Sequence, residues 1–248
     1  MAVRDLVWNG CLNVRDLGGL PTEDGGETRF GAVIRADCVR LLDDDGWAAL
    51  VRAGVGRIVD LRDPREREDD RPDDLPVEVV HVPILDRLDD DGWAEIIALS
   101  EGAASHADAQ LLVYLHFLDH CRARFVEAVA AVAEAPERPV VVHCHGGKDR
   151  TGLVVALLLR LARVPATVIA ADYALSADRL RPRHEQWLAQ AADEAERRRI
   201  ERISSSPEAA MVGVLDALDE RYGGAGRYLL DGGLTRPVLA AARARLRA

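Results

Sequence analysis

The clearest chemical signal in this sequence is a cysteine and an arginine separated by five residues, Cys144 and Arg150. The thiolate of a cysteine is a strong nucleophile, and the planar guanidinium of an arginine can hold two oxygens of a phosphate group. Gly146 and Gly147 stand between them and lack side chains that would keep an anion away from the backbone. The pair therefore predicts attack by sulfur on a phosphoryl group that the arginine holds.

The surrounding residues predict the elements that position this pair. Residues 140–142 are three valines and favour a buried strand, whereas residues 153–161 form an apolar run of mostly good helix formers. Residues 143–152 form the turn between them. A strand, a glycine-bearing turn and a helix N-terminus make an anion site, because backbone N–H groups and the positive helix end converge there. We expect this turn to bind substrate through His145, Gly146, Gly147, Lys148, Asp149, Arg150 and Thr151.

The C-x5-R arrangement is typical of cysteine-dependent phosphatases. The predicted helix N-terminus, Arg150 and Lys148 all favour the thiolate form of Cys144. Arg150 would also favour the transition state, in which the charge on the equatorial oxygens is redistributed. Thr151 is expected to donate a hydrogen bond to the thiolate and make it a better leaving group in the second step. We therefore expect a phosphocysteine that water hydrolyses.

Lysine occurs once in this chain: of the 32 lysine and arginine residues, only Lys148 is a lysine. A surface cation would have been arginine here, so Lys148 indicates a need for a compact, flexible ammonium group. We include Lys148 among the catalytic residues. Asp149 is expected either to take part in catalysis or to pair with a neighbouring arginine and hold the shape of the loop.

Composition limits the other classes. The 248 residues carry a formal net charge of −10, which disfavours general nucleic-acid binding. No basic region followed by a long apolar run marks a signal peptide, and no stretch approaches the ~18 apolar residues of a membrane-spanning helix. Without C-x-x-C spacing, reduced thiols in the cytoplasm are the default expectation. The cysteines are Cys11, Cys38, Cys121 and Cys144.

Strands and helices alternate in the first two thirds of the chain, and the last third is helical. This pattern predicts an α/β fold with a mostly parallel central sheet flanked by helices, in one domain. Residues 60–74 are dense in charge and predict an exposed loop with one helical turn. Further strands are expected at 32–35, 57–60 and 77–82, and further helices at 43–54, 89–102, 108–135, from 165, at 181–203, 206–222 and from 235.

At residues 143–152 the pattern His-Cys-x-x-Gly-Lys-Asp-Arg-Thr-Gly resembles the signature of the atypical bacterial tyrosine phosphatase family. The likeness covers nearly the whole chain. It implies a phosphatase-fold core over residues 1–248, with a lid-like helical insertion that we expect at roughly residues 89–120. Other segments similar to family motifs are Asn13–Asp16, Asp60–Arg62 followed by Arg65 and Glu66, Ala171–Tyr173, and Tyr228 with Leu229.

The resemblance also implies a substrate class: phosphotyrosine, with phosphoserine, phosphothreonine or phosphoinositides in some members. It implies no cofactor and no metal. Because some members are secreted without a signal peptide, a cytoplasmic location is only the default, and the oligomeric state stays open.

The leaving oxygen needs a proton donor. The family places this acid just after the strand that ends at Pro83, which gives Asp86 here. Asp60, Asp63 and Asp149 are the rivals.

Three charged residues in the motifs similar to the family are expected not to take part in the chemistry but either to contact the residues that do or to form structural ion pairs. They are Asp16, Arg35 and Arg62.

The sequence of the loop also admits other interpretations. A phosphoinositide or phosphopeptide binding module without turnover, a redox-sensing thiol protein and a buried structural cysteine all remain open. A metal site at His143, Cys144 and His145 is disfavoured, because adjacent strand residues point to opposite faces. A nucleotide-binding loop is excluded, because Asp149 stands where serine or threonine would follow the lysine.

Overall fold

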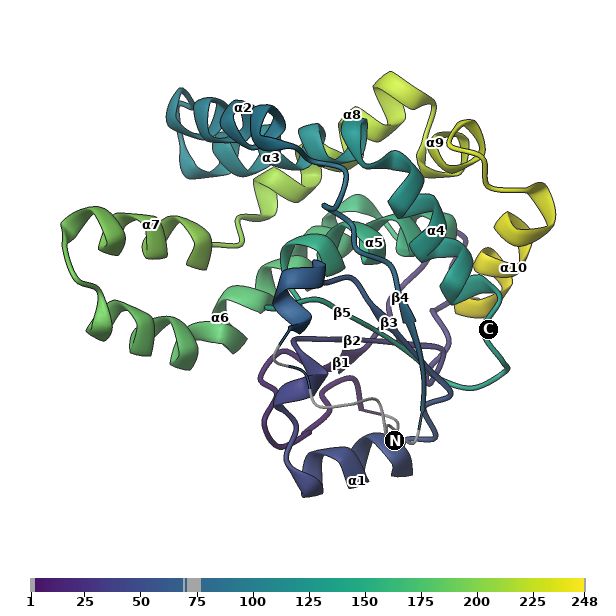
Figure 1. Ribbon diagram of the computed structural model, residues 1–248. Helices are drawn as coiled ribbons and strands as arrows, with labels where there is room; N and C mark the ends of the chain where they lie inside the picture. Colours follow the sequence, from purple (N-terminus) through teal and green to yellow (C-terminus); the bar gives the residue numbers. More distant parts are fainter. Residues whose placement is uncertain (1–2, 69, 71–76, 248) are drawn as a thin grey trace.

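The computed structural model describes residues 3–68, 70 and 77–247, and its centre is a five-stranded sheet in the order β1-β2-β5-β3-β4 (Figure 1). Strand β1 is antiparallel to β2, and the other neighbouring strands run parallel. This confirms the expected α/β class and the mostly parallel sheet. The strands are β1 Arg15–Asp16, β2 Val33–Ala36, β3 Arg57–Asp60, β4 Glu78–His81 and β5 Val140–His143.

Each face of the sheet packs on its own hydrophobic core. Successive strand residues point to opposite faces, so in β5 Val140 and Val142 belong to one core and Val141 to the other. Helix α1 (Asp44–Arg52) covers the face to which Val141 points, and its buried Leu50 belongs to the same core. Figure 1 shows α1 below the sheet and most of the other helices above it. These two covered faces explain why the parallel strands consist of apolar runs.

Besides α1, the described residues form further helices, most of which lie in the upper layer and the left-hand projection in Figure 1. They are the α-helices α2 Asp90–Glu101, α3 His106–His120, α4 Arg122–Ala133, α5 Asp149–Leu161, α6 Ala166–Gln190, α7 Glu194–Ser204, α8 Glu208–Tyr222, α9 Ala225–Asp231 and α10 Arg236–Leu246, and the short 3-10 helices η1 Val39–Leu41 and η2 Pro64–Arg67.

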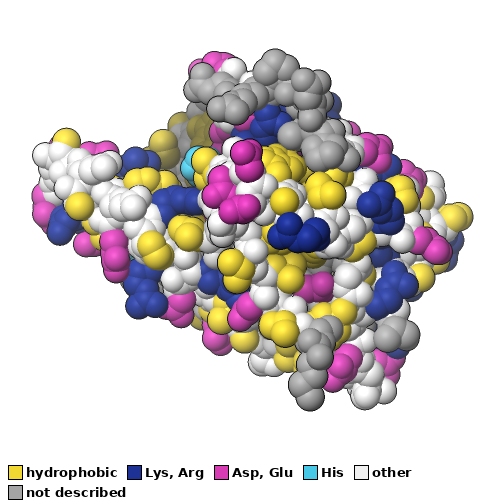
Figure 2. Space-filling view, turned by 90° about the horizontal axis from the view of Figure 1, so that it is seen from below, with side chains coloured by type: hydrophobic (Ala, Val, Ile, Leu, Met, Phe, Trp, Pro, Cys, Tyr) yellow, Lys and Arg dark blue, Asp and Glu magenta, His cyan; other side chains and the backbone are white. Residues whose placement is uncertain are grey.

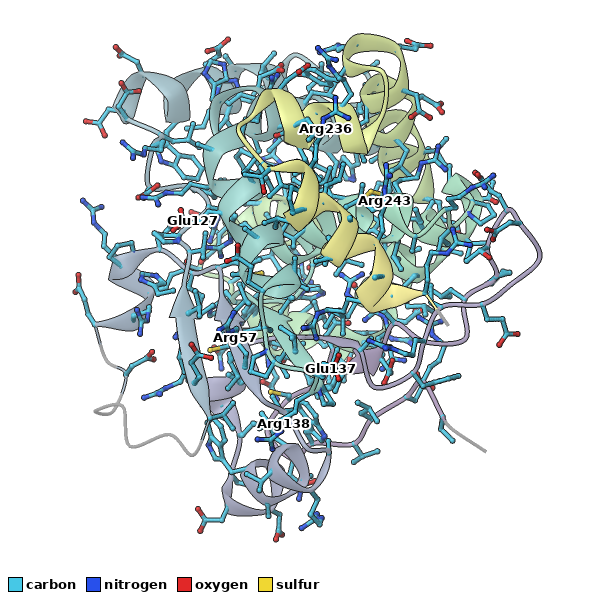
Figure 3. The ribbon with its side chains drawn as sticks, turned by 90° about the vertical axis from the view of Figure 1, so that its right-hand side faces the viewer. Arg57, Glu127, Glu137, Arg138, Arg236 and Arg243 are labelled. Atoms are coloured by element: carbon cyan, nitrogen blue, oxygen red, sulfur yellow. The ribbon has the colours of Figure 1, made fainter. Side chains whose placement is uncertain are left out.

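At the end of the sheet opposite the cysteine loop, arginine side chains bind backbone carbonyls of neighbouring segments. Arg57 at the start of β3 donates to the carbonyl of Ala131, and Arg138 ahead of β5 donates to the carbonyl of Gly54 (Figure 3). On the face seen from below, basic and acidic side chains are interspersed (Figure 2).

Several helix starts and one helix end are confirmed, and each is marked by a capping side chain or a left-handed glycine. Asp43 caps α1 by accepting a hydrogen bond from the amide of Gly46, and Asp89 caps α2 by accepting one from Gly92. Helix α8 ends at Tyr222, where Gly223 adopts a left-handed φ of 73°. Thr235 caps α10 as expected from the Thr-Arg-Pro sequence.

Two expected helices were wrong, and a third helix was missed. The helix expected over 108–135 is two helices, because the chain breaks at Cys121 with φ −108° and ψ 19°. The helix expected over 181–203 is also divided: α6 continues through Pro182 to Gln190, and α7 begins at Glu194. Helix α9 was not expected.

The segment expected as an exposed loop at 60–74 is partly buried. It contains the short helix η2, but Asp60 and Arg62 are each only 2% exposed. Positions 69 and 71–74 of that prediction lie outside the described residues.

The expected insertion at 89–120 corresponds to helices α2 and α3, which pack on each other. Its role as a lid and the extent of a single domain stay predictions. Among the described residues, no helix is long and apolar enough to cross a membrane.

Candidate active site

Cys144 lies at the carboxyl end of β5, directly beneath the start of α5. The side chain is 2% exposed, and α5 begins at Asp149 instead of Leu153, so the expected turn is shorter than its sequence indicated. Arg150, Thr151 and the loop glycines thus meet at a helix N-terminus. Ligands bind at this edge of parallel sheets because the loops and helix starts converge there.

Hydrogen bonds from outside the loop fix its backbone. The carbonyl of His145 accepts from the amide of Cys38 at 3.0 Å, and the Asn13 side-chain amide donates to the carbonyls of Gly146 and Gly147 at 3.0 and 3.2 Å. Arg35 also donates to the Gly147 carbonyl, at 2.8 Å. In a trans peptide the N–H points away from the preceding carbonyl. Three consecutive amides are therefore turned toward the inside of the loop, where an anion would sit.

Two features of the backbone require a glycine at position 147. Its φ is +64°, and a Cβ at this position would collide with the carbonyl oxygen of Ala36 at the end of β2. Glycine alone fits both the left-handed backbone and the close approach of the neighbouring strand.

Arg150 is held by two acids from η2 and the residue before it. Glu66 accepts hydrogen bonds from both terminal nitrogens, with Nη2–Oε1 at 2.8 Å, and Asp63 Oδ2 lies 3.3 Å from Nη1. Within the described part of the chain, these bonds leave Nε–H and one Nη2 N–H of Arg150 without an acceptor. Those two groups share one edge of the guanidinium, the edge that suits two phosphate oxygens.

The contacts of Arg150 also shift the pKa values around it. Burial raises the pKa of Glu66, but the hydrogen bonds and charge of Arg150 outweigh burial and lower it to about 2. For Asp63, burial dominates and raises the pKa above its ordinary value, even though Arg150 acts in the opposite direction. Glu66 is therefore the charged partner of Arg150, whereas Asp63 more readily keeps a proton.

Lys148 reaches away from the loop toward the end of α7. Its Nζ donates to the carbonyls of Ile203 at 2.6 Å and Ser205 at 2.8 Å, and it lies 3.3 Å from Asp149 Oδ1. The last carbonyls of a helix have no partner within the helix. The ammonium group satisfies such carbonyls here, and so it ties the loop to the connection between α7 and α8.

Among the described residues Asp149 forms no ion pair with an arginine, although pairing with a neighbouring arginine was one of its expected roles. Its Oδ1 accepts a hydrogen bond from the Tyr114 hydroxyl at 2.5 Å and one from the Gln110 side chain at 3.3 Å, both from α3. The Tyr114 hydroxyl lies 2.9 Å from that of Tyr173. Asp149 therefore connects the start of α5 with α3.

Asp86 follows β4, as expected, but Arg124 binds its carboxylate. Nε of Arg124 donates to Oδ1 at 2.9 Å, and Nη2 donates to Oδ2. Asp63 contacts Arg150 of the loop directly, and its Oδ1 is buried without a hydrogen-bond partner among the described residues. The rival Asp60 is neutralised by Arg62, whose Nη2 lies 2.8 Å from Oδ2.

The expected structural pairs are present in two of three cases. Arg62 pairs with Asp60, and Arg35 pairs with Asp172 at 2.8 Å. Asp16 instead accepts backbone hydrogen bonds from Gly18 and Gly31 at 2.7 and 2.8 Å.

Asp172 on α6 is the centre of a buried charge network. It also pairs with Arg15 at 3.1 Å and with Arg4. Burial raises the pKa of Asp172, but the charges of Arg15, Arg35 and Arg4 outweigh burial and hold it well below its ordinary range. Since Arg35 also donates to the Gly147 carbonyl, the network connects α6 to the backbone of the loop.

The two histidines beside Cys144 turn to different partners. His143 is buried, and its Nε2 lies 3.6 Å from Asp60 Oδ1. His145 is half exposed, and its Nδ1 lies 4.0 Å from Glu66. The two histidines therefore face different acids on either side of Cys144.

A cavity of about 600 Å³ opens beside the loop. Its lining includes Lys148, Asp149 and Arg150 from the loop and the start of α5, and Arg199 and Arg202 of α7. The wall from α2 and α3 is largely apolar and includes Trp93, Ile96, Ile97, Ala109, Val113 and Phe117. A deep anion site next to an apolar cavity fits a phosphate ester whose organic part is apolar.

Sequence reasoning missed several supports of the loop. Asn13, Glu66 and Asp172 lie in segments that resembled family motifs, so the resemblance pointed to them without giving a role. Tyr114 had no such signal, because its partner Asp149 is 35 residues away in the chain.

The fold and the site together define a cysteine-dependent phosphatase: a thiol at the end of a central parallel strand, inward-facing amides and a held arginine beside a helix start. A sequence model of the tyrosine phosphatase family matches residues 6–248. The chain belongs to the tyrosine phosphatase family.

Two proteins that are similar to this chain over most of its length are also named phosphatases. The triple specificity protein phosphatase PtpB of Mycobacterium tuberculosis is 29% identical over 276 aligned positions, which span 96% of this chain and 97% of the relative. A tyrosine-protein phosphatase of Nostoc commune is 32% identical over 228 positions, spanning 85% and 72% of the two chains.

Proposed function

We propose that Cys144, Arg150, Lys148, Asp149 and Asp86 are the functional residues of this phosphatase. The observation that carries the proposal is the loop itself, in which carbonyls bound from outside leave the amides of Gly146, Gly147 and Lys148 to face an anion. The Cys144 thiolate attacks phosphorus, the ester oxygen leaves with a proton, and a phosphocysteine remains. Water then attacks phosphorus and gives a proton to the carboxylate that protonated the leaving oxygen, Asp86 in this proposal, and sulfur leaves as thiolate.

Arg150 acts by electrostatic stabilisation and positioning. Its Nε–H and its second Nη2 N–H bind two equatorial oxygens, while Glu66 holds the end of the guanidinium through Nη1 and Nη2. The Thr151 hydroxyl is buried and has no hydrogen-bond partner among the described residues, which fits a donor reserved for the departing thiolate. His145, Gly146, Gly147, Lys148, Asp149, Arg150 and Thr151 form the proposed binding loop.

The proton donor is a carboxyl group at the exits of β3 and β4. Asp86 is the candidate from the family resemblance, and it must leave Arg124 to act. A specific observation favours Asp63 as second candidate: it contacts Arg150, and burial raises its pKa, as a general acid requires.

The substrates we propose are aryl phosphates, phosphotyrosine first, with phosphoserine, phosphothreonine and phosphoinositides as further classes. The apolar wall with Trp93 and Phe117 suits an aromatic ring. The name of the mycobacterial relative, a triple specificity phosphatase, supports a range wider than phosphotyrosine. We propose the cytoplasm as the location.

The test is hydrolysis of an aryl phosphate by the full chain in the presence of a chelator, with wild type compared to Cys144→Ser. We expect turnover by the wild type and a loss of ~10³-fold or more in the variant, because the nucleophile is removed. Cys38→Ser is the matched control, since Cys38 is also buried but has no proposed chemistry. A wild type that binds inorganic phosphate without turnover would identify a binding module instead.

A further inference from the structure

Three side chains outside the active site converge between α2 and α3. Glu95 comes from α2, and His116 and His120 lie one turn apart on α3. Each offers one ligand atom, and these atoms lie within 4.8 Å of one another. The two imidazole rings stack with centroids 4.1 Å apart and planes 19° apart, and Glu95 Oε2 lies 3.9 Å from His116 Nδ1. In Figure 1 the two helices lie side by side at the upper left.

One member of the cluster is buried, and the other two are exposed to solvent. His116 is 6% exposed, and its Nε2 has no hydrogen-bond partner among the described residues. A buried polar nitrogen without a partner calls for an explanation, such as a ligand or ion. Glu95 and His120 are exposed, so their side chains are free to rotate toward an ion that enters from solvent.

We propose that Glu95, His116 and His120 bind a divalent transition metal ion, Zn²⁺ foremost. Two imidazoles and one carboxylate form a donor set that suits zinc, with water in the fourth position. Histidines at positions i and i+4 of a helix lie on one face, so both can reach one ion. Imidazole nitrogen disfavours Ca²⁺ and Mg²⁺, which require oxygen ligands.

The ion would link α2 to α3, the two helices that supply the apolar wall of the active-site cavity. Trp93 and Ile96 on α2 and Val113 on α3 line that cavity. Tyr114 on α3 binds Asp149. A bound metal therefore stabilises the wall and its contact with the loop, while the metal itself has no part in the reaction.

The experiment titrates ZnCl₂ into the full chain by calorimetry, in a Cys144→Ser background that removes the thiolate as a competing ligand. We expect one ion per chain. Glu95→Gln and His120→Ala, both exposed positions that the fold tolerates, should each weaken binding at least tenfold. His106→Ala is the matched control, because His106 is an exposed histidine on the same helix outside the cluster.

A second measurement separates binding at this cluster from binding elsewhere. Zinc should raise the melting temperature of the Cys144→Ser protein and of its His106→Ala variant, but not that of its Glu95→Gln variant. The proposal is overturned if the Cys144→Ser protein binds no zinc, or if Glu95→Gln and His120→Ala bind it as tightly as their parent. Failure of the phosphatase assay would not affect either result.

Discussion

At the scale of single residues, the reaction depends on how Arg150 divides its hydrogen bonds. Glu66 occupies the end of the guanidinium, so the free edge with Nε–H is fixed in direction before substrate arrives. Preorganised donors are effective because they need no rearrangement as charge develops. Glu66 therefore positions Arg150, and Arg150 contacts the reacting group.

The proton donor can be identified from leaving-group dependence. If Asp86 is the acid, Asp86→Asn should slow turnover of poor alkyl leaving groups ~10²-fold or more but barely affect p-nitrophenyl phosphate, whose leaving group needs little protonation. Asp63→Asn should then reduce both substrates equally, through Arg150. The measurement is kcat on both substrates for each variant.

The opposite pattern would move the role to Asp63, the buried acid with the raised pKa. Asp89→Asn is a matched control, because Asp89 is an exposed aspartate in the same segment whose carboxylate caps helix α2. Equal effects of both test variants on both substrates would contradict either assignment.

At the scale of elements, the loop is connected to two helical segments from different parts of the chain. Lys148 ties it to the end of α7, and Asp149 ties it to α3. Both segments border the cavity. The single lysine of the chain thus has a structural reason: one ammonium group donates in several directions, which a planar guanidinium does less readily.

Replacing Lys148 should loosen α7. In Lys148→Met the carbonyls of Ile203 and Ser205 lose their partner, so backbone amides of residues 194–206 should exchange with deuterium at least tenfold faster. Amides of β5, in the core, should be unaffected. Hydrogen exchange read by mass spectrometry checks this, and unchanged protection of 194–206 would contradict the proposed tie.

Element boundaries were predictable where a local signal marks them. Asp43, Asp89 and Thr235 cap their helices through their own side chains, and these starts were expected. The break at Cys121 has no glycine or proline, and α6 continues through Pro182 against the ordinary tendency of proline to end a helix. Tertiary packing decides such positions, so the local sequence does not reveal them.

Much of the site could also be predicted, because its chemistry lies within one continuous stretch, residues 143–152. The partners of that stretch could not. Asp60 and Arg62 lie in a run of charges that favours solvent, yet they are buried because they neutralise each other. Such pairing depends on three-dimensional neighbours, and hydropathy along the chain contains no information about it.

At the scale of the whole molecule, buried acids paired with arginine link stability to pH. The pKa of Asp60 is lowered to about 2: burial alone would raise it, but the charge of His143 and the contacts of Arg62 outweigh burial. The pKa of Glu66 is likewise lowered to about 2 by Arg150. A depressed pKa in the folded state means that the unfolded state binds more protons as the pH falls.

Stability should therefore be fully present above about pH 5 and lost progressively toward about pH 2. Urea unfolding as a function of pH measures this. Glu66→Gln should flatten the profile in that window, whereas Glu101→Gln, at an exposed position of α2, should leave it unchanged. A profile of Glu66→Gln as steep as the wild type would show that the pair with Arg150 contributes nothing to the acid limb.

The buried charge network at Asp172 predicts a second effect on the stability of the whole molecule. Asp172→Asn leaves Arg15 and Arg35 buried without their counter-charge, so the free energy of unfolding should fall by ~3–5 kcal/mol. Urea unfolding at neutral pH checks this value. A change below ~1 kcal/mol would contradict a role for the network in supporting the fold.

The most direct test of the central claim is to trap the intermediate. The full chain is mixed with p-nitrophenyl phosphate, quenched in acid within milliseconds and digested for mass spectrometry. We predict that the peptide with residues 139–150 gains one phosphoryl group on Cys144, and that Cys144→Ser shows none. Rapid turnover with no phosphorylated Cys144 at any quench time, or turnover retained by Cys144→Ser, would contradict the proposed mechanism.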